Sequence, residues 1–255
     1  MTAERRAEAE RLRGWFELQL CFAAVAAERR GEPLGETVSV LTNLHRRFGL
    51  GTLGLIASER EAVDPLWQRY VEGLEARRDL ASRLDWTVAC CAEGPGSKAS
   101  KPVFGCFAFD APDGDGVVRI HFENRDDDGV SPLVEAKAER RRGEAAAMFA
   151  HIAATYPQAR TVKGGSWLYN LEAYRRLFPP QYGASRVRPE PLRLNGTSSW
   201  GQLIDHLGQV KPKAREVFLA NLADLDPAAP WRVFPLPALA VSAPLEAFTA
   251  FYRGA

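Results

Sequence analysis

The densest group of side chains that could contact a ligand is the string Lys-Gly-Gly-Ser-Trp-Leu-Tyr-Asn at residues 163–170. Paired glycines allow the backbone to approach a bound molecule closely, and aromatic rings can form the walls of a pocket. The string is not the Gly-x-Ser-x-Gly turn of a hydrolase nucleophile. It predicts either a substrate pocket or a packed core, and the candidate pocket residues are His121, Gly165, Ser166, Trp167 and Tyr169.

Three consecutive arginines, Arg140 to Arg142, stand directly before Gly143. A glycine-containing turn at a helix start exposes backbone N–H groups, and the helix dipole and the guanidinium groups favour a pyrophosphate there. The alternative is one unbroken helix from Ser131-Pro132 to Thr155 that carries the arginines. On that helix Arg141 and Arg142 lie within or beside an apolar stripe. They must then reach solvent, meet an anion, or lie where the helix is interrupted near Gly143.

A strand predicted over residues 117–124 carries two groups that could accept a proton, His121 and Glu123. Because side chains alternate along a strand, both share a face with Arg119 and not with the apolar residues between them. This face is either part of an active site or a solvated face of a sheet.

The elements that must position these groups fall into two predicted regions, residues 1–85 and 86–255. The first has helical periodicity throughout, and in the second short β-rich runs separated by turn formers alternate with helices. Helices are predicted at 2–30, 36–48, 64–80, 131–155, 171–178, 200–207, 212–225 and the C-terminus, and strands at 86–92, 103–110, 117–124, 160–168, 192–195 and 232–241. We therefore predict an α+β fold with a mostly antiparallel central sheet flanked by helices, preceded by a helical N-terminal region.

The order of three antiparallel strands, a helix, a strand and a second helix resembles the acyl-CoA-binding core of the GNAT N-acyltransferase superfamily over about residues 86–195. Two strings fall at corresponding places. Residues 140–145, Arg-Arg-Arg-Gly-Glu-Ala, match the family's Q/R-x-x-G-x-G/A turn, and residues 170–173, Asn-Leu-Glu-Ala, look like its Asn-x-x-Ala string, with Gly183 downstream.

The resemblance implies a bacterial acyl-CoA-dependent N-acyltransferase that uses acetyl-CoA or another acyl-CoA and acts on an amine. The cofactor would be held by Arg140, Arg141, Arg142, Gly143, Ala145 and Asn170. In this family a base on the central strands deprotonates the amine and a Tyr protonates the departing thiolate, which implies Glu123, Tyr174 and Tyr182 as candidate catalytic residues. Leu177 occupies the position where the family's Tyr is expected. The alternative is therefore a non-catalytic ligand-binding or protein-interaction protein on the same scaffold.

Composition limits the partners. The chain has 255 residues, of which 46% are hydrophobic and 25% charged, with a formal net charge of +1. This mixture is typical of a globular protein, and a near-neutral charge argues against nucleic acid as a partner. No apolar run approaches the ~20 residues of a membrane span. The histidines and cysteines lack metal-binding spacing, so no metal is expected. We expect a cytoplasmic protein with a small-molecule substrate, and its apolar helical stripes permit a homodimer.

Overall fold

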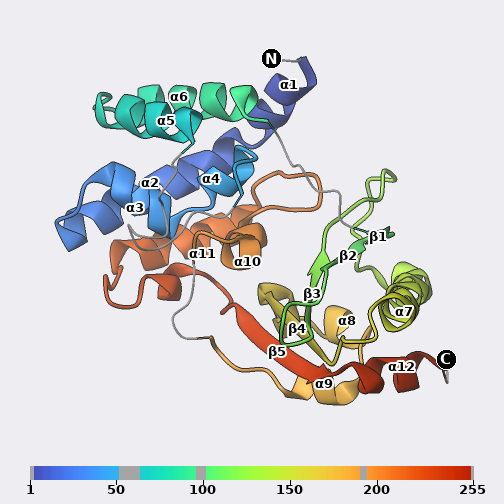
Figure 1. The fold of residues 1–255 in the computed structure, drawn as a ribbon. Coiled ribbons are helices and arrows are strands. Elements are labelled where there is room, and N and C mark those ends of the chain that lie inside the picture. Colours follow the sequence, from blue (N-terminus) through green and yellow to red (C-terminus); the bar gives the residue numbers. More distant parts are fainter. Residues whose placement is uncertain (1–2, 52–63, 96–101, 190–193, 254–255) are drawn as a thin grey trace. The chain divides into compact units, whose positions relative to one another are not determined.

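The chain divides into two compact units, each built from two separate segments (Figure 1). The computed structural model describes residues 3–51, 64–95, 102–189 and 194–253, with the backbone alone for Thr197. Unit 1 comprises Met1–Ala99 and Leu192–Pro235, and unit 2 comprises Ser100–Pro191 and Leu236–Ala255. These units differ from the predicted regions 1–85 and 86–255, because the chain returns to unit 1 after residue 191.

Unit 1 is helical. Its elements are α1 (Ala3–Arg11), α2 (Arg13–Arg30), α3 (Leu34–Leu41), α4 (Leu44–Arg47), α5 (Pro65–Glu75), α6 (Leu80–Glu93), α10 (Thr197–Trp200), a 3-10 turn at Gly201–Leu203, α11 (Pro212–Ala223) and a 3-10 turn at Pro230–Val233. Gly31 ends α2 with a φ of 64°, and the Asp64 side chain accepts a hydrogen bond from the Leu66 N–H at the start of α5.

The predicted strand at 86–92 is wrong, because these residues lie inside α6. They bury Thr87, Val88, Cys90 and Cys91 at helical spacing in the core of unit 1. A short apolar run with aromatic and β-branched residues fits a buried strand and a buried helix equally well by pattern alone. Other segments also differ. The predicted helix 2–30 breaks at Leu12, and helix 36–48 breaks between Leu41 and Leu44. Helix 64–80 ends at Glu75, helix 171–178 is shortened to Glu172–Arg175, and helix 200–207 is reduced to single turns. The predicted strand 103–110 is interrupted between Phe104 and Phe107, and the described part of strand 192–195 is a turn.

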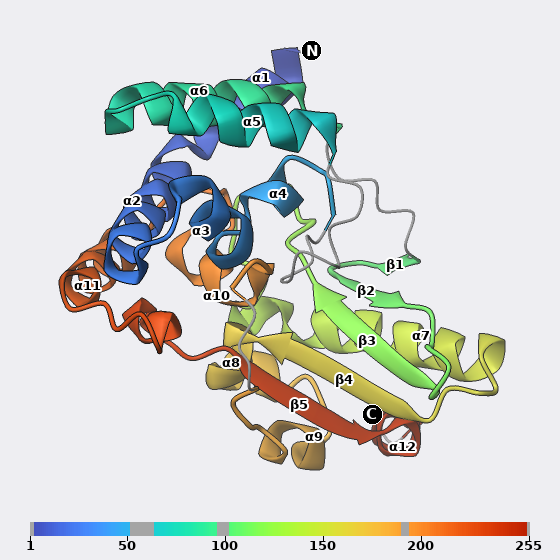
Figure 2. The same ribbon diagram turned by 60° about the vertical axis from the view of Figure 1, so that its left-hand side comes forward.

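Unit 2 contains one five-stranded sheet in the order β1 (Val103–Phe104), β2 (Phe107–Asp110), β3 (Val117–Phe122), β4 (Thr161–Ser166) and β5 (Leu239–Pro244) (Figure 2). The predicted hairpin is present as the antiparallel pair β2–β3. The sheet is mixed rather than mostly antiparallel, because β3 and β4 run parallel. A parallel pair needs a crossover connection, and α7 (Ala138–Thr155) provides it. The expected extended run 232–241 is a strand only from Leu239.

The two faces of this sheet differ. Side chains of α7, α8 (Glu172–Arg175), α9 (Pro180–Ala184) and α12 (Leu245–Arg253) form a single core with one face. The buried face includes Val118, Ile120 and Val162. The alternate residues of β3 and β4, among them Arg119, His121 and Lys163, lie on the other face, which we call the polar face.

Candidate functional site

The parallel strands β3 and β4 pair over only the first half of their lengths. Their register joins Val117–Arg119 to Thr161–Lys163 and ends there, before residues 120–122 and 164–166. Figure 2 shows the arrowheads of the two strands farther apart than their opposite ends. Where a ladder ends inside a sheet, the facing backbone N–H and C=O groups need other partners. We call this opening the β3–β4 fork.

Two glycines form the β4 side of the fork and face opposite sides of the sheet. A Cβ on Gly164 would lie 1.9 Å from Tyr169 Oη and 2.5 Å from Tyr182 Oη, so no side chain fits there. A Cβ on Gly165 would meet no atom within 4 Å, and this residue is exposed. The core interpretation of the 163–170 string therefore applies to Gly164, which packs on the core, whereas Gly165 is exposed on the polar face.

The tyrosines of the predicted site lie inside the core. Tyr169, Tyr174 and Tyr182 are buried, and the Tyr169 and Tyr182 hydroxyls are 3.0 Å apart. Burial raises the pKa of all three phenols. Leu177, at the position of the expected Tyr, is buried as well. The structure therefore places Tyr174 and Tyr182 away from the polar face.

Two further predicted contact residues are held by local hydrogen bonds. Ser166 Oγ accepts a hydrogen bond from the Leu168 N–H and so caps the 3-10 turn Trp167–Asn170. Asn170 Nδ2 donates to Trp167 O at 2.7 Å and to Pro237 O at 2.8 Å. Both side chains stabilise the chain where it leaves β4, and Trp167 is only half-buried beside them.

A polar pair on the polar face joins β3 to β2. His121 Nε2 lies 2.8 Å from Asp110 Oδ2, and the two side chains are 36% and 39% exposed. Register pairs Ala108 with His121 and Asp110 with Arg119, so Asp110 is the diagonal neighbour of His121 on the same face. Sequence reasoning missed Asp110. Because side chains alternate along each strand of the predicted hairpin, Asp110 could have been placed on the same face as His121. This required knowledge of the register between the two strands.

The alternative base, Glu123, lies just beyond the end of β3. Its side chain is 69% exposed, and its carboxylate accepts a hydrogen bond from Arg125 at 3.1 Å. The sequence predicted that Glu123 shares a strand face with His121. In the structure Glu123 lies outside the strand, in a solvated position.

The arginine triplet lies on a continuous helix. Helix α7 passes through Gly143 without interruption, although it begins at Ala138, after a 3-10 turn, rather than at Ser131-Pro132. Ala145, a predicted cofactor contact, is buried in the core of unit 2. The glycine-turn prediction for residues 140–145 is therefore wrong, and the arginines are positioned by helical phase.

Arg141 is fully buried and meets anions of the protein itself. Its guanidinium pairs with Asp126 and with Glu144 and donates from Nε to Pro132 O at 3.0 Å. Glu144 also accepts a hydrogen bond from the Cys106 N–H at 3.0 Å. Arg141 is thus occupied within unit 2 and does not face solvent, where a cofactor phosphate would have to approach.

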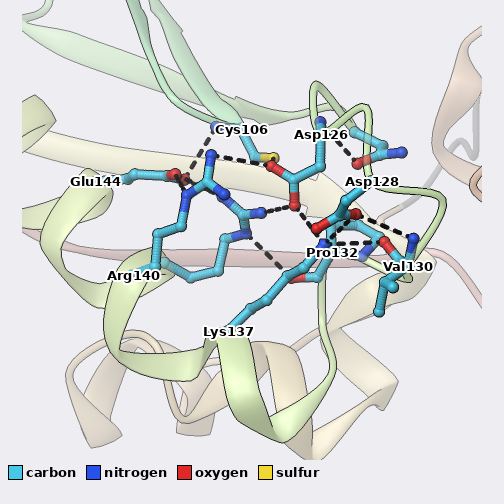
Figure 3. Close-up of polar contacts among 10 residues, drawn as sticks. Cys106, Asp126, Asp128, Val130, Pro132, Lys137, Arg140 and Glu144 are labelled. Atoms are coloured by element: carbon cyan, nitrogen blue, oxygen red, sulfur yellow. Dashed lines mark hydrogen bonds and ion pairs between the residues drawn. The ribbon is translucent and has the colours of Figure 1, made fainter.

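Figure 3 shows how the loop after β3 is tied to the start of α7 by this group. Lys137 Nζ lies 2.8 Å from both Asp126 Oδ2 and Asp128 Oδ1 and donates to Val130 O. Arg140 adds contacts to Asp126 at 3.2 Å and to Glu144 at 3.1 Å. Three carboxylates and three cations balance in charge. We call these six residues the α7 ion-pair network; they are Asp126, Asp128, Lys137, Arg140, Arg141 and Glu144.

The network controls the protonation of its central carboxylate. Burial alone would raise the pKa of Asp126, but hydrogen bonds from Lys137 and Arg141 and the charge of Arg140 lower it from 3.8 to about 2. Asp126 is therefore ionised at neutral pH, and its carboxylate connects the loop to α7 through Lys137 and Arg141.

Two arginines of the triplet keep solvent-accessible guanidinium groups. The Arg140 and Arg142 side chains are 58% and 37% exposed. Arg142 donates to Arg176 O and lies 3.5 Å from the exposed Glu139. Of the residues expected from sequence to hold the cofactor, these two side chains and Gly143 are at least partly exposed, and Arg140 also contacts Asp126 and Glu144.

Comparison with protein-family models, with curated proteins and with solved structures finds no match to this chain. The functional argument therefore rests on the geometry described above. Within the described residues, no three His, Cys, Asp or Glu side chains gather as metal ligands would. Nor does the described part of the chain contain a helix with the length and apolar character needed to cross a bilayer.

Proposed function

We propose that unit 2 binds an acyl-CoA at the β3–β4 fork and transfers its acyl group to an amine. The observation that carries this proposal is the parallel strand pair whose ladder ends after Arg119 and Lys163. An extended ligand arm can lie beside such strands and use their backbone groups, as an added strand does in peptide recognition. Gly165 leaves room for the arm on the polar face.

The two strings that resemble the GNAT superfamily support this assignment by their positions. Residues 140–145 lie on α7, the crossover from β3 to β4, and residues 170–173 directly follow β4. Both therefore belong to elements connected to the fork. Arg140 and Arg142 are the side chains available for the cofactor's phosphates, and Arg141 instead orients this part of α7 through its buried ion pairs.

Calorimetric titration of the whole protein with acetyl-CoA, together with its thermal unfolding, tests the proposal. A ligand at 100 times its Kd stabilises the folded state by ~2.7 kcal/mol, which corresponds to roughly 5 °C or more in Tm for a unit of this size. Gly165→Val should lower acetyl-CoA affinity at least tenfold without lowering the Tm of the free protein. Gly114→Val, whose new side chain also enters open space in the turn between β2 and β3, is the matched control. Absence of acetyl-CoA binding at millimolar concentration would overturn the proposal.

One observation favours a second candidate, a non-catalytic acyl-CoA-binding protein on the same scaffold. Tyr174 and Tyr182 are buried, and Leu177 stands where the catalytic Tyr is expected, so none of these three positions supplies an acid at the polar face. This candidate predicts acetyl-CoA binding with no thiol release in the presence of primary amines. Detection of free CoA with a thiol reagent separates the two candidates.

A further inference from the structure

Two arginine side chains of unit 2 converge on a single backbone oxygen. Arg175, the last residue of α8, donates from Nη1 to Tyr169 O at 3.2 Å and to Asn170 O at 2.8 Å. Arg186, just after α9, donates from Nη1 to the same Tyr169 oxygen at 3.3 Å. This oxygen belongs to the 3-10 turn Trp167–Asn170, which directly follows β4. Two separate elements therefore bring two cationic groups together at the carboxyl end of a parallel strand.

No carboxylate offsets these two charges in the part of the chain that the structure describes. Neither Arg175 nor Arg186 forms an ion pair there. Between residues 171 and 189 the sequence has four arginines and one acidic residue, Glu172. Glu172 is exposed, and no ion pair joins it to either arginine. Strand β5, which packs against α9 and the turn, has no charged residue. Two like charges held together in this way repel each other, and a bound anion would remove the repulsion.

Both guanidinium groups keep the edge that binds oxyanions. Only the Nη1 atoms donate to the turn, so Nε and Nη2 of Arg175 and Arg186 have no hydrogen-bond partner among the described residues. Arg186 is exposed, and the Nε and Nη2 atoms of the half-buried Arg175 are accessible to solvent. The N–H groups of this edge form a planar fork that matches two oxygens of a phosphate or a carboxylate.

We propose that Arg175 and Arg186 bind a phosphate group at the carboxyl end of β4. A phosphate fits two forks, because its three terminal oxygens can accept from both guanidinium groups at once, whereas one bidentate pair already occupies a carboxylate. The position agrees with the general rule that ligands of open α/β sheets bind beyond the carboxyl ends of the strands. The site uses neither the arginines of α7 nor Gly165, so it stands whether or not unit 2 binds an acyl-CoA.

Binding of inorganic phosphate to the whole protein tests the site without a cofactor. Heteronuclear NMR of the arginine Nε–Hε groups reports on each side chain, and the variants described below assign the signals. As phosphate is added at constant ionic strength, the signals of Arg175 and Arg186 should shift with one common Kd. The signal of Arg253, whose Nε donates to Thr249 O at 3.1 Å within α12, should stay in place.

Substitutions of Arg186 test the role of its fork. Arg186→Gln should weaken phosphate binding at least tenfold, because charge-assisted hydrogen bonds are lost. Arg186→Lys keeps the charge without the fork and should recover only part of the affinity. Arg253→Gln is the matched control, since Arg253 is an exposed arginine of the same unit that also donates to a backbone carbonyl, and it should leave the phosphate affinity within twofold.

Folding of these variants is checked by circular dichroism and urea unfolding. Arg186 is exposed and donates a single hydrogen bond to the described residues, so its variants should fold like the wild type. Arg175→Lys, which keeps a cation beside the turn, provides a second variant and should also weaken phosphate binding at least tenfold.

Acetyl-CoA identifies the source of the phosphate. If the site holds a phosphate of the acyl-CoA, inorganic phosphate should compete with acetyl-CoA, and Arg186→Gln should weaken the binding of both. If it holds a separate phosphorylated molecule, Arg186→Gln should leave the Kd for acetyl-CoA within twofold, and the two ligands should bind together. A protein that binds phosphate at these arginines but does not bind acetyl-CoA would lack the proposed function and keep this site.

A purely structural role for the two arginines gives a different result. If they only cap the carbonyl groups of the turn, tens of millimolar phosphate should leave their Nε–Hε signals unchanged, and Arg186→Gln should change the Tm equally with and without phosphate. Either unchanged signals, or equal loss of phosphate affinity in Arg186→Gln and Arg253→Gln, would overturn the proposal.

Discussion

At the residue scale, Gly164 and Gly165 differ in the space that surrounds their Cα atoms. A methyl group on Gly164 would meet the hydroxyls of Tyr169 and Tyr182, whereas one on Gly165 would enter open space. Overpacking of a close-packed core costs about 1–3 kcal/mol. We expect Gly164→Ala to lower the free energy of unfolding of unit 2 by about that amount. Gly165→Ala should change it by less than about 0.5 kcal/mol, as surface changes usually do. Equal effects of the two substitutions in urea unfolding would contradict this packing.

Adjacent arginines provide a second matched pair. Arg141 is buried against Asp126 and Glu144, and Arg142 has a 37% exposed side chain. Removing one partner of a buried ion pair costs about 3–5 kcal/mol, because the other partner is left without compensation. Arg141→Met should therefore destabilise unit 2 by about 3 kcal/mol, and Arg142→Met by less than about 1 kcal/mol. Urea unfolding followed by circular dichroism measures both, and an Arg142→Met effect as large as that of Arg141→Met would argue against the network.

Sequence patterns identified these residues but not their partners. The apolar stripe of α7 indicated that Arg141 could be buried only beside an anion. The anions are the carboxylates of Asp126 and Glu144 in the same unit. Asp126 comes from an irregular loop, and its contact with α7 depends on how that loop folds back, which no periodicity encodes. His121 was singled out from the sequence and Asp110 was not, because their pairing depends on the register of the hairpin, which the turn sets.

At the element scale, the continuity of α7 can be tested at Gly143. Glycine inside a helix is less stable than alanine by roughly 0.5–1 kcal/mol, because it loses more backbone freedom on folding. Gly143 is exposed, and an added methyl group would meet no atom within 4 Å. Gly143→Ala should therefore stabilise unit 2 by about that amount in urea unfolding. Destabilisation would indicate the interrupted helix that the sequence string suggests.

The attachment of the loop to α7 should depend on pH. The pKa of Asp126 falls to about 2 in the folded protein from an ordinary value of 3.8. A lowered folded-state pKa stabilises the protein above pH 3.8, and this contribution is lost as pH falls from there towards 2. The carboxyl carbon of Asp126, followed by NMR in the folded protein, should titrate with a midpoint near 2, and unit 2 should lose stability over the same range. A midpoint near 3.8 would show that Lys137 and Arg141 do not hold this carboxylate.

Element types were predicted well where one periodicity dominates. The hairpin β2–β3, the strand β4 and the helices α11 and α12 lie where the pattern placed them, and α7 ends at Thr155 as predicted but begins at Ala138 rather than near residue 131. The segment at 86–92 was misassigned because its apolar run is compatible with either period. The parallel pairing of β3 and β4 follows from the crossover through α7, so it was implied by the order of elements but not by either strand alone.

At the scale of the whole molecule, the two units are interleaved along the chain. Residues 192–235 belong to unit 1, so the chain enters unit 2 twice. Trp200 packs edge-on against Phe22 with ring centroids 5.3 Å apart, and its carbonyl accepts a hydrogen bond from Trp15 Nε1. Contacts over such sequence distances leave no local pattern. The change from helical to strand-rich sequence near residue 86 therefore predicted a boundary between two units, but not the return of residues 192–235 to unit 1.

This interleaving predicts which pieces of the chain can fold. A fragment of residues 86–255 begins inside α6 and retains α10 and α11 without the Trp15 and Phe22 side chains that cover Trp200. It should aggregate or lack a cooperative transition, because it exposes part of the unit 1 core.

The complementary piece keeps one complete core. In unit 2, Val187 and Ala240 exchange two backbone hydrogen bonds, of 2.9 and 2.8 Å, so the two segments of the unit lie side by side there. Residues 100–189 joined by a short Gly-Ser linker to 236–255 retain every buried residue of the unit 2 core. This chain should be soluble and unfold in a single urea transition, with a slope of roughly 1–3 kcal/mol per molar. If 86–255 folds cooperatively and the joined chain does not, the two segments do not form an independent unit.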